Sequence, residues 1–209
     1  MSRLLLAAAF LCGALVSTSA WLLWPERYEQ RSAAELMDVV MWGKEPVGGP
    51  FSLVDHNGQQ RTDSDFRGKF LLVYFGFIYC SDICPIDLQA IAGALDKLGP
   101  DAEAVQPLFI TVDPEKDTPE QLKSYVALFH PKLIGLTGTL AQIRKVAADY
   151  KVYFAKNQPR IKDDRAVDHS GFTFLIDGDG EYLGFFPPAT SADQIVAVLR
   201  PHLRGRPAT

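Results

Sequence analysis

Cysteine, histidine and clusters of positive charge are all scarce in this chain of 209 residues. It has three cysteines and four histidines, and its net charge is −4 with no stretch rich in lysine and arginine. The absence of a basic patch argues against a nucleic-acid partner. Internal repeats and low-complexity tracts are also missing, and the hydrophobic content of 47% is ordinary for a globular protein, so a largely disordered chain is excluded.

Charge is absent altogether from one long run near the N-terminus. Residues 4–24 contain no charged side chain over 21 positions. A helix of that length would span about 30 Å, the thickness of the hydrocarbon core of a bilayer. Trp21 and Trp24 stand at its end, where indole rings favour the headgroup region. We therefore expect residues 1–24 to be a single-pass anchor in a bacterial inner membrane with the folded domain in the periplasm. A signal peptide cleaved after the small-residue site Thr-Ser-Ala is the alternative.

The rest of the chain divides into two parts. Residues 25–49 end in a stretch rich in glycine and proline and are expected to form a juxtamembrane stalk or linker, whereas residues 50–209 are expected to form the folded domain. Cys12 lies in the apolar run, where a thiol packs as a small hydrophobic group. Cys80 and Cys84 are therefore the only thiols of the exported domain.

Apolar runs alternate with helical patterns throughout the folded domain. An Asn57-Gly58 turn between two short runs predicts a β-hairpin at its start. The almost continuous apolar run 69–77 predicts a central strand that is buried on both faces. Strands alternating with helices are typical of parallel pairing through crossovers, and a closing hairpin adds an antiparallel edge. The expected fold class is α/β, with helices on both faces of a mixed sheet. The other predicted strands are 104–112, 133–138, 151–156, 171–177 and 181–188, and the predicted helices are 85–99, 119–129, 139–150 and 191–203.

Cys80 and Cys84 are separated by three residues and lie between the central strand and the next helix. In such sheets, ligands and reactive groups gather where the C-terminal end of a strand turns into a helix. Pro85 suits the first turn of a helix, which places the helix N-terminus beside Cys84, where its dipole favours the thiolate. Four interpretations stay open: a structural disulfide, a redox-active dithiol, a pair of metal ligands, or two buried thiols without a functional role.

As metal ligands, two convergent thiolates would favour a soft ion such as Cu(I) or Zn(II) over magnesium or calcium. Structural zinc requires four ligands, whereas Cu(I) accepts two or three. His169 lies near the end of the long polar loop 157–170, at the mouth of a predicted strand, and is a candidate for the third ligand, although a hydrogen-bonded loop histidine would fit the same position. The other histidines, His56, His130 and His202, are expected to be solvated or to pack.

Three separated blocks of the sequence match the motifs of a known family. They are GKFLLVYFGFIYCSDICP, ITVDPEKDTPEQLKSY and DHSGFTFLIDGDGEYLG. The domain thereby resembles the Sco/SenC family of copper chaperones from about Pro50 to Leu203. The resemblance implies a thioredoxin-like fold with an inserted hairpin, usually behind one membrane anchor. It also implies ligation of Cu(I), and also of Cu(II), by Cys80, Cys84 and His169.

The same resemblance implies a metallochaperone rather than an enzyme. Its client would be the dinuclear copper centre of cytochrome c oxidase subunit II. Because thiols form disulfides in an oxidising compartment and then lose metal affinity, we also expect a thioredoxin-like reductant to act before copper is loaded.

A thiol–disulfide oxidoreductase or redox sensor is the alternative function, because the Cys80/Cys84 pair alone permits it. Metal transfer needs a third ligand and disulfide exchange does not, so His169 discriminates between the two. A peroxidase on the same broad fold would require a threonine three residues before its reactive cysteine, and position 77 is Phe.

Overall fold

The computed structural model describes residues 32–43, 45–156 and 167–204. The predicted membrane segment 1–24 lies outside these ranges. Within them, no helix combines the length and the apolar character needed to cross a membrane. The first described helix, α2 (Ala33–Trp42), lies inside the segment predicted to be a stalk.

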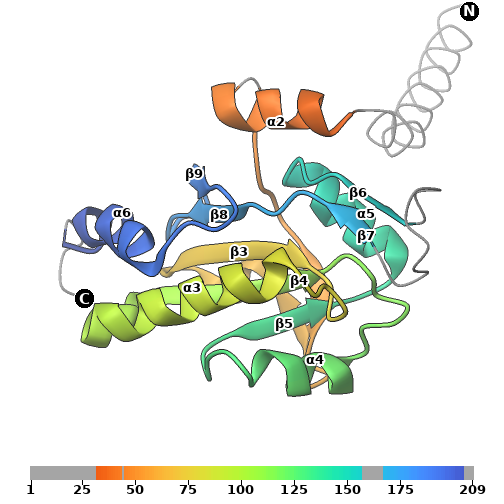
Figure 1. Cartoon of the computed structure of the whole chain (residues 1–209), viewed down its shortest axis with the longest axis horizontal. Helices are drawn as coiled ribbons and strands as arrows, with labels where there is room; N and C mark the ends of the chain where they lie inside the picture. Colours follow the sequence, from red (N-terminus) through yellow and green to blue (C-terminus); the bar gives the residue numbers. More distant parts are fainter. Residues whose placement is uncertain (1–31, 44, 157–166, 205–209) are drawn as a thin grey trace, which may run out of the picture.

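Seven strands of the described chain form one mixed sheet (Figure 1). They are β1 (Ser52–Asp55), β2 (Gln60–Thr62), β3 (Phe70–Gly76), β4 (Val105–Thr111), β5 (Ile134–Thr137), β8 (Thr173–Ile176) and β9 (Tyr182–Phe186). Their order across the sheet is β2-β1-β5-β4-β3-β8-β9. The central strands β3, β4 and β5 are parallel, and the outer strands pair antiparallel. The predicted mixed α/β sheet of thioredoxin-like type is confirmed.

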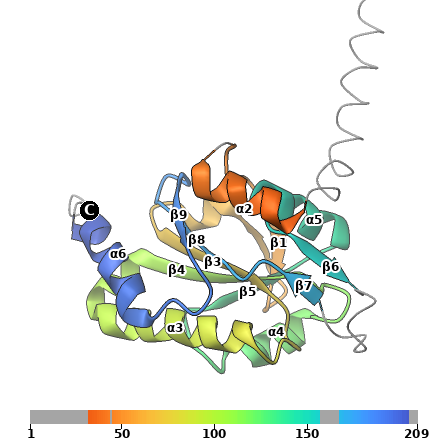
Figure 2. The same cartoon turned by 45° about the horizontal axis from the view of Figure 1, so that its top comes forward.

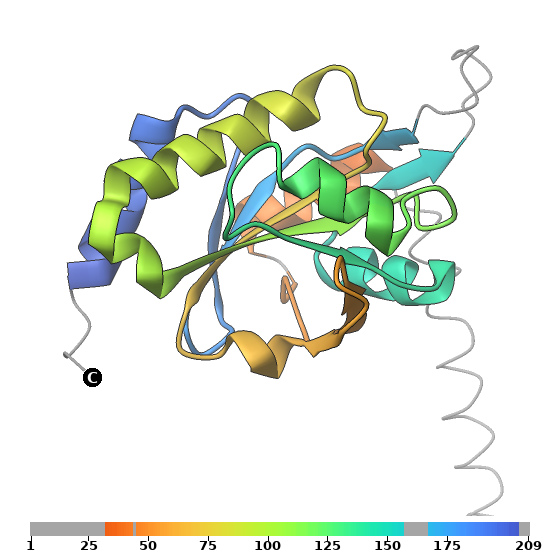
Figure 3. The same cartoon turned by 90° about the horizontal axis from the view of Figure 1, so that it is seen from below.

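Helices cover both faces of this sheet. They are α3 (Ile83–Leu98), α4 (Pro119–Val126), α5 (Leu140–Asp149) and α6 (Ala192–Arg204), with short 3₁₀ turns η1 (Asp63–Phe66) and η2 (Gly99–Ala104). Side chains of α3, α4 and α6 share one hydrophobic cluster, and those of α2 and α5 belong to the other. Figure 1 shows α2 on the opposite side of the sheet from α3, and Figure 3 shows α3 and α4 lying over the same face.

The central position of β3 explains its apolar sequence. All seven of its residues are buried. Leu71, Val73 and Phe75 point into one cluster, whereas Phe70 and Tyr74 point into the other. A strand that is covered on both faces needs apolar side chains at successive positions. The loop that carries Cys80 therefore begins directly at the end of a rigid, buried strand.

The predicted N-terminal hairpin is confirmed. β1 and β2 pair antiparallel around the Asn57-Gly58 turn, where Gly58 has a φ of +79°. That left-handed backbone suits glycine. Asp55 closes the turn by accepting the amide hydrogens of Asn57 and Gln59.

Helix α2 packs on the domain. Leu36 and Val40 are 1% and 3% exposed, and Val40 lies in the same cluster as Phe75 of β3. A capping box between Ser32 and Glu35 begins the helix. The folded unit therefore includes residues N-terminal to position 50.

Candidate metal centre

The loop that carries Cys80 connects β3 to α3. The amide of Cys80 donates to the carbonyl of Phe77 at 3.2 Å, which closes a tight turn. The amide of Ile78 donates to a carboxylate oxygen of Asp117 at 3.1 Å. The loop is thus held at its start, and Cys80 lies on its partly exposed side.

Helix α3 begins at Ile83, two residues before the predicted start at Pro85. Asp82 takes the N-cap position, although its side chain makes no capping hydrogen bond. Pro85 still falls within the first turn, where backbone amides have no partner inside the helix and a missing N–H costs little. Cys84 consequently belongs to the helix and is completely buried. Of the two sulfurs, that of Cys84 is fixed and that of Cys80 is carried by a loop.

His169 reaches the site from a separate two-stranded sheet. β6 (Phe154–Lys156) and β7 (Val167–His169) pair antiparallel, with Phe154 opposite His169. Figure 2 shows this pair at the end of the main sheet where α3 begins. The imidazole meets the rings of Phe77 and Tyr74 edge to face, with centroids 5.7 and 6.5 Å away. These contacts fix the plane of the ring.

The three residues singled out from the sequence converge in space. The Sγ of Cys84 lies 3.4 Å from Nε2 of His169, and one donor atom from each of Cys80, Cys84 and His169 lies within 4.8 Å of the others. Nδ1 of His169 faces the carbonyl of Ser170 at 3.2 Å. Nε2 is therefore the ring nitrogen that faces the sulfur of Cys84. Among the residues that the structure describes, no other histidine, cysteine or acidic cluster of three meets this criterion.

The two thiols differ in acidity. The hydrogen bond from Cys84 lowers the pKa of the Cys80 thiol well below its ordinary value, and a hydrogen bond with His169 lowers it further, against the effect of burial. The pKa of Cys84 is raised, first by the hydrogen bond to Cys80 and then by burial. The hydrogen bond to Cys80 and burial therefore act against the effect that the helix dipole was predicted to have on Cys84.

The backbone of β3 approaches the sulfur of Cys84 closely. A Cβ at Gly76 would lie 2.9 Å from that sulfur, 2.9 Å from the ring of Phe109 and 3.1 Å from the ring of Tyr74. Only glycine leaves room for a sulfur so near the strand. The sequence signal for this was a glycine within an otherwise apolar strand, which suggests a close approach.

A buried carboxyl group lies one helical turn after Cys84. Asp87 is 4% exposed, and its Oδ1 accepts the amide hydrogen of Ala189 at 2.7 Å. Burial raises its pKa, whereas this amide and the hydroxyl of Tyr74 lower it. The hydroxyl of Tyr74 also lowers the pKa of Cys84. Sequence reasoning missed both residues, although an acidic residue on the apolar face of a helix was a visible signal.

The remaining histidines, expected to be solvated or to pack, make hydrogen bonds or ring contacts elsewhere in the domain. His56 and His130 each accept a backbone amide hydrogen through Nδ1 at 3.1 Å. The ring of His202 packs beside Phe70 with a centroid distance of 6.0 Å. None of the three belongs to the Cys80–Cys84–His169 cluster.

The donor set fits a soft ion of low coordination number. Two sulfurs and one neutral imidazole match the preference of Cu(I), whereas a structural zinc site would need a fourth ligand. Binding requires both thiols to lose their protons. Because the pKa of Cys80 is lowered, its thiol gives up its proton the more readily at neutral pH.

The SCO1/SenC family model matches residues 40–204 of this chain. The chain belongs to the SCO1/SenC family. It is 39% identical over 204 residues to the mitochondrial SCO2 homologue of Mus musculus, which covers 97% of this chain and 78% of that protein. It is 41% identical over 167 residues to the mitochondrial SCO1 homologue of Homo sapiens, covering 78% of this chain and 54% of that protein. The crystal structure of Arabidopsis thaliana ScoI with copper bound superposes with a TM-score of 0.71 at 39% identity, covering 77% of this chain and 99% of that one.

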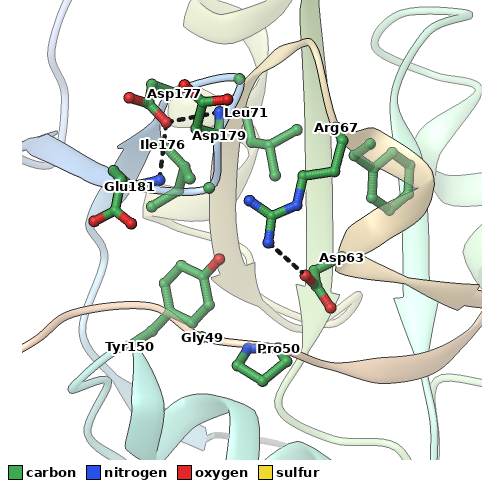
Figure 4. Close-up of a pocket in the computed structure, with 13 residues that line it drawn as sticks. Gly49, Pro50, Asp63, Arg67, Leu71, Tyr150, Ile176, Asp177, Asp179 and Glu181 are labelled. Carbon is green, nitrogen blue, oxygen red and sulfur yellow. Dashed lines mark hydrogen bonds and ion pairs between the residues drawn. The ribbon is translucent and has the colours of Figure 1, made fainter.

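The SCO1/SenC domain has a separate cavity at the opposite end of β3 (Figure 4). It encloses about 280 Å³ between η1, the β8–β9 turn and Tyr150. Arg67 is paired with Asp63 at 3.0 Å, and the acidic side chains of Asp177 and Glu181 lie on the other side. Acidic groups outnumber the single guanidinium among its lining residues, so the cavity does not suit an anion. The cysteine–histidine cluster remains the candidate functional site.

Proposed function

We propose that this SCO1/SenC protein is a copper chaperone that holds Cu(I), and also Cu(II), between Cys80, Cys84 and His169. The observation that carries the proposal is the convergence of their donor atoms within 4.8 Å. The copper-bound ScoI of Arabidopsis thaliana, 39% identical, supports the choice of metal. Two sulfurs and an imidazole bind Cu(I) without completing a rigid four-ligand cage, which suits a protein that must also release the ion.

The unequal placement of the ligands suggests how release proceeds. Cys84 and His169 are held by α3 and by the β6–β7 pair, whereas Cys80 lies on a loop that reaches the surface. A donor atom of the client approaches from the exposed side and displaces the sulfur of Cys80 first. His169 and Cys84 then give up the ion in turn. The client proposed from the family resemblance is the dinuclear copper site of cytochrome c oxidase subunit II.

We also propose that residues 1–24 anchor the protein in a bacterial inner membrane and that the domain works in the periplasm. The uncharged run from residue 4 to residue 24 supports this arrangement. In an oxidising compartment Cys80 and Cys84 form a disulfide, which removes both sulfur ligands. A thioredoxin-like protein restores the dithiol before loading.

A titration of the full-length chain with Cu(I), against a coloured Cu(I) chelator, tests the proposal. The reduced protein should take up one equivalent, and the protein oxidised beforehand to the Cys80–Cys84 disulfide should take up none. A Cys80→Ser and Cys84→Ser double variant is the control for uptake elsewhere in the chain. Equal uptake by the oxidised and reduced forms would contradict the assignment of the ligands.

Thiol–disulfide exchange is a second candidate function, and the lowered pKa of the partly exposed Cys80 favours it. The Cys80 thiolate would attack a client disulfide, releasing one client sulfur and forming a mixed disulfide. Cys84 would then displace the other client sulfur, leaving the client reduced and the Cys80–Cys84 pair oxidised. His169 takes no covalent part in these two steps and acts on them only through the pKa of Cys80. A His169→Ala variant should therefore weaken Cu(I) binding while disulfide exchange persists, which separates the two functions.

A further inference from the structure

A completely buried carboxylate lies behind the loop that carries Cys80. The side chain of Asp117 is 0% exposed. One of its oxygens accepts the amide hydrogen of Ile78 at 3.1 Å and the hydroxyl hydrogen of Thr111 at 2.6 Å. We propose that Asp117 is a positioning residue that fixes the start of this loop and thereby sets where the sulfur of Cys80 lies relative to Cys84 and His169.

Asp117 is itself held by the C-terminal end of β4, which pairs with the C-terminal end of β3. Thr111 is the last residue of β4 and pairs with Gly76, the last residue of β3. The hydroxyl of Thr111 also accepts the amide hydrogen of Asp113 at 2.9 Å, and the carbonyl of Asp113 accepts that of Asp117 at 2.9 Å. The carboxylate is thus fixed at the C-terminal end of a central strand. Its hydrogen bond to Ile78 in turn restrains a residue 39 positions earlier in the chain.

The bond to Ile78 acts between two parts of the site. On one side is Phe77, whose ring packs edge to face against His169 at 5.7 Å. On the other side is the turn that ends at Cys80, where the amide of Cys80 returns to the carbonyl of Phe77. The hydrogen bond from Ile78 to Asp117 therefore restrains both the ring of Phe77, which packs against His169, and the turn that leads to Cys80.

Cys80 is the ligand for which such a restraint matters most. Cys84 is fixed by α3, whereas Cys80 belongs to a segment in which Tyr79, Ser81 and Asp82 are exposed. A disulfide brings two sulfurs to about 2.05 Å, whereas bound metal needs room between them. The sulfur of Cys80 must move between these states, and the bond at Ile78 keeps that movement within residues 79–82.

Hydrogen bonding and charge predict different behaviour for two variants. Asp117→Asn keeps an oxygen that accepts from both Ile78 and Thr111, so the loop should stay in place. Asp117→Ala removes the acceptor and leaves two donors unsatisfied. If Asp117→Ala does not fold, Asp117→Ser replaces it, since its hydroxyl is polar and one bond closer to the backbone than the carboxylate oxygens. Asp55→Ala is the matched control, because Asp55 is also buried and accepts two backbone amides, yet lies on β1, three strands from β3.

Three measurements on the full-length chain decide the matter: hydrogen exchange of the Ile78 amide and alkylation of Cys80, both in the reduced metal-free protein, and Cu(I) affinity. Asp117→Ala should speed the exchange at Ile78 and the alkylation of Cys80. It should also weaken Cu(I) binding about 10- to 100-fold, the usual effect of losing an outer-sphere partner. Asp117→Asn and Asp55→Ala should leave all three close to wild type.

The inference is overturned if Asp117→Ala matches the Asp55→Ala control in exchange, alkylation and affinity. It is also overturned if Asp117→Asn changes them as strongly as Asp117→Ala, because charge rather than the hydrogen bond would then be responsible. The copper measurement rests on the proposed function. If the reduced wild-type chain does not bind Cu(I), that function fails, while the two measurements in the metal-free protein still decide the role of Asp117.

Discussion

Replacing Gly76 with alanine would place a methyl group directly against the sulfur of Cys84. The new Cβ would lie 2.9 Å from Sγ and 2.9 Å from the ring of Phe109, and ordinary contact begins at 3.4 Å, so the neighbours must retreat by about 0.5 Å. Cys84 and Phe109 are both completely buried in one hydrophobic cluster, so such a movement disturbs the core. Overpacking of this kind costs about 1–3 kcal/mol of stability. A ligand site tolerates displacements of only about 0.5 Å, so we expect Cu(I) affinity to fall about tenfold or more.

Urea unfolding and competitive Cu(I) titration of the Gly76→Ala variant measure the two effects. Gly93→Ala is the matched control, since its Cβ would lie 3.4 Å from Ala192 and a helical glycine replaced by alanine gains up to about 1 kcal/mol. The control should bind Cu(I) like wild type. The packing argument fails if Gly76→Ala is as stable and binds Cu(I) as tightly as Gly93→Ala.

Three further changes test other parts of the structure. Burial raises the pKa of Asp87, so its ionisation opposes folding; Asp87→Asn should stabilise the protein at pH 7–8 in urea unfolding, and the gain should vanish as the pH falls below about 4. Because the pKa of Cys80 is lowered, its alkylation rate should stay constant from pH 8 to pH 6, whereas that of an ordinary thiol falls below about pH 8.5. Leu36→Ala in α2 should cost about 2–5 kcal/mol; a loss below about 0.5 kcal/mol would show that α2 does not pack on the domain.

Local patterns predicted most of the sheet. The run 69–77 contains β3 because a strand covered on both faces leaves a continuous apolar signature. The Asn57-Gly58 turn predicted the first hairpin because few residues adopt its backbone. Helix α2 was not predicted to pack, because its buried residues are few and its contacts are made with segments distant in sequence. The start of α3 was placed two residues late because proline marks the first turn of a helix without defining its first residue.

The site was predictable to a different degree for each ligand. Cys80 and Cys84 could be found from their spacing at the end of a central strand. His169 could be assigned only through the family resemblance, since its approach depends on the pairing of β6 with β7 and on ring packing against Phe77. The supporting role of Asp117 depends on a contact across 39 residues, which no local pattern encodes.

The most direct test of a three-ligand copper site is the Cu(I) affinity of the reduced full-length chain beside its His169→Ala variant. His130→Ala is the matched control, because His130 accepts a backbone amide far from the cysteines. We expect His169→Ala to bind Cu(I) at least about tenfold more weakly than wild type, and His130→Ala to bind as wild type does. Equal affinity of wild type and His169→Ala would contradict the copper-chaperone account and favour thiol–disulfide exchange by Cys80 and Cys84.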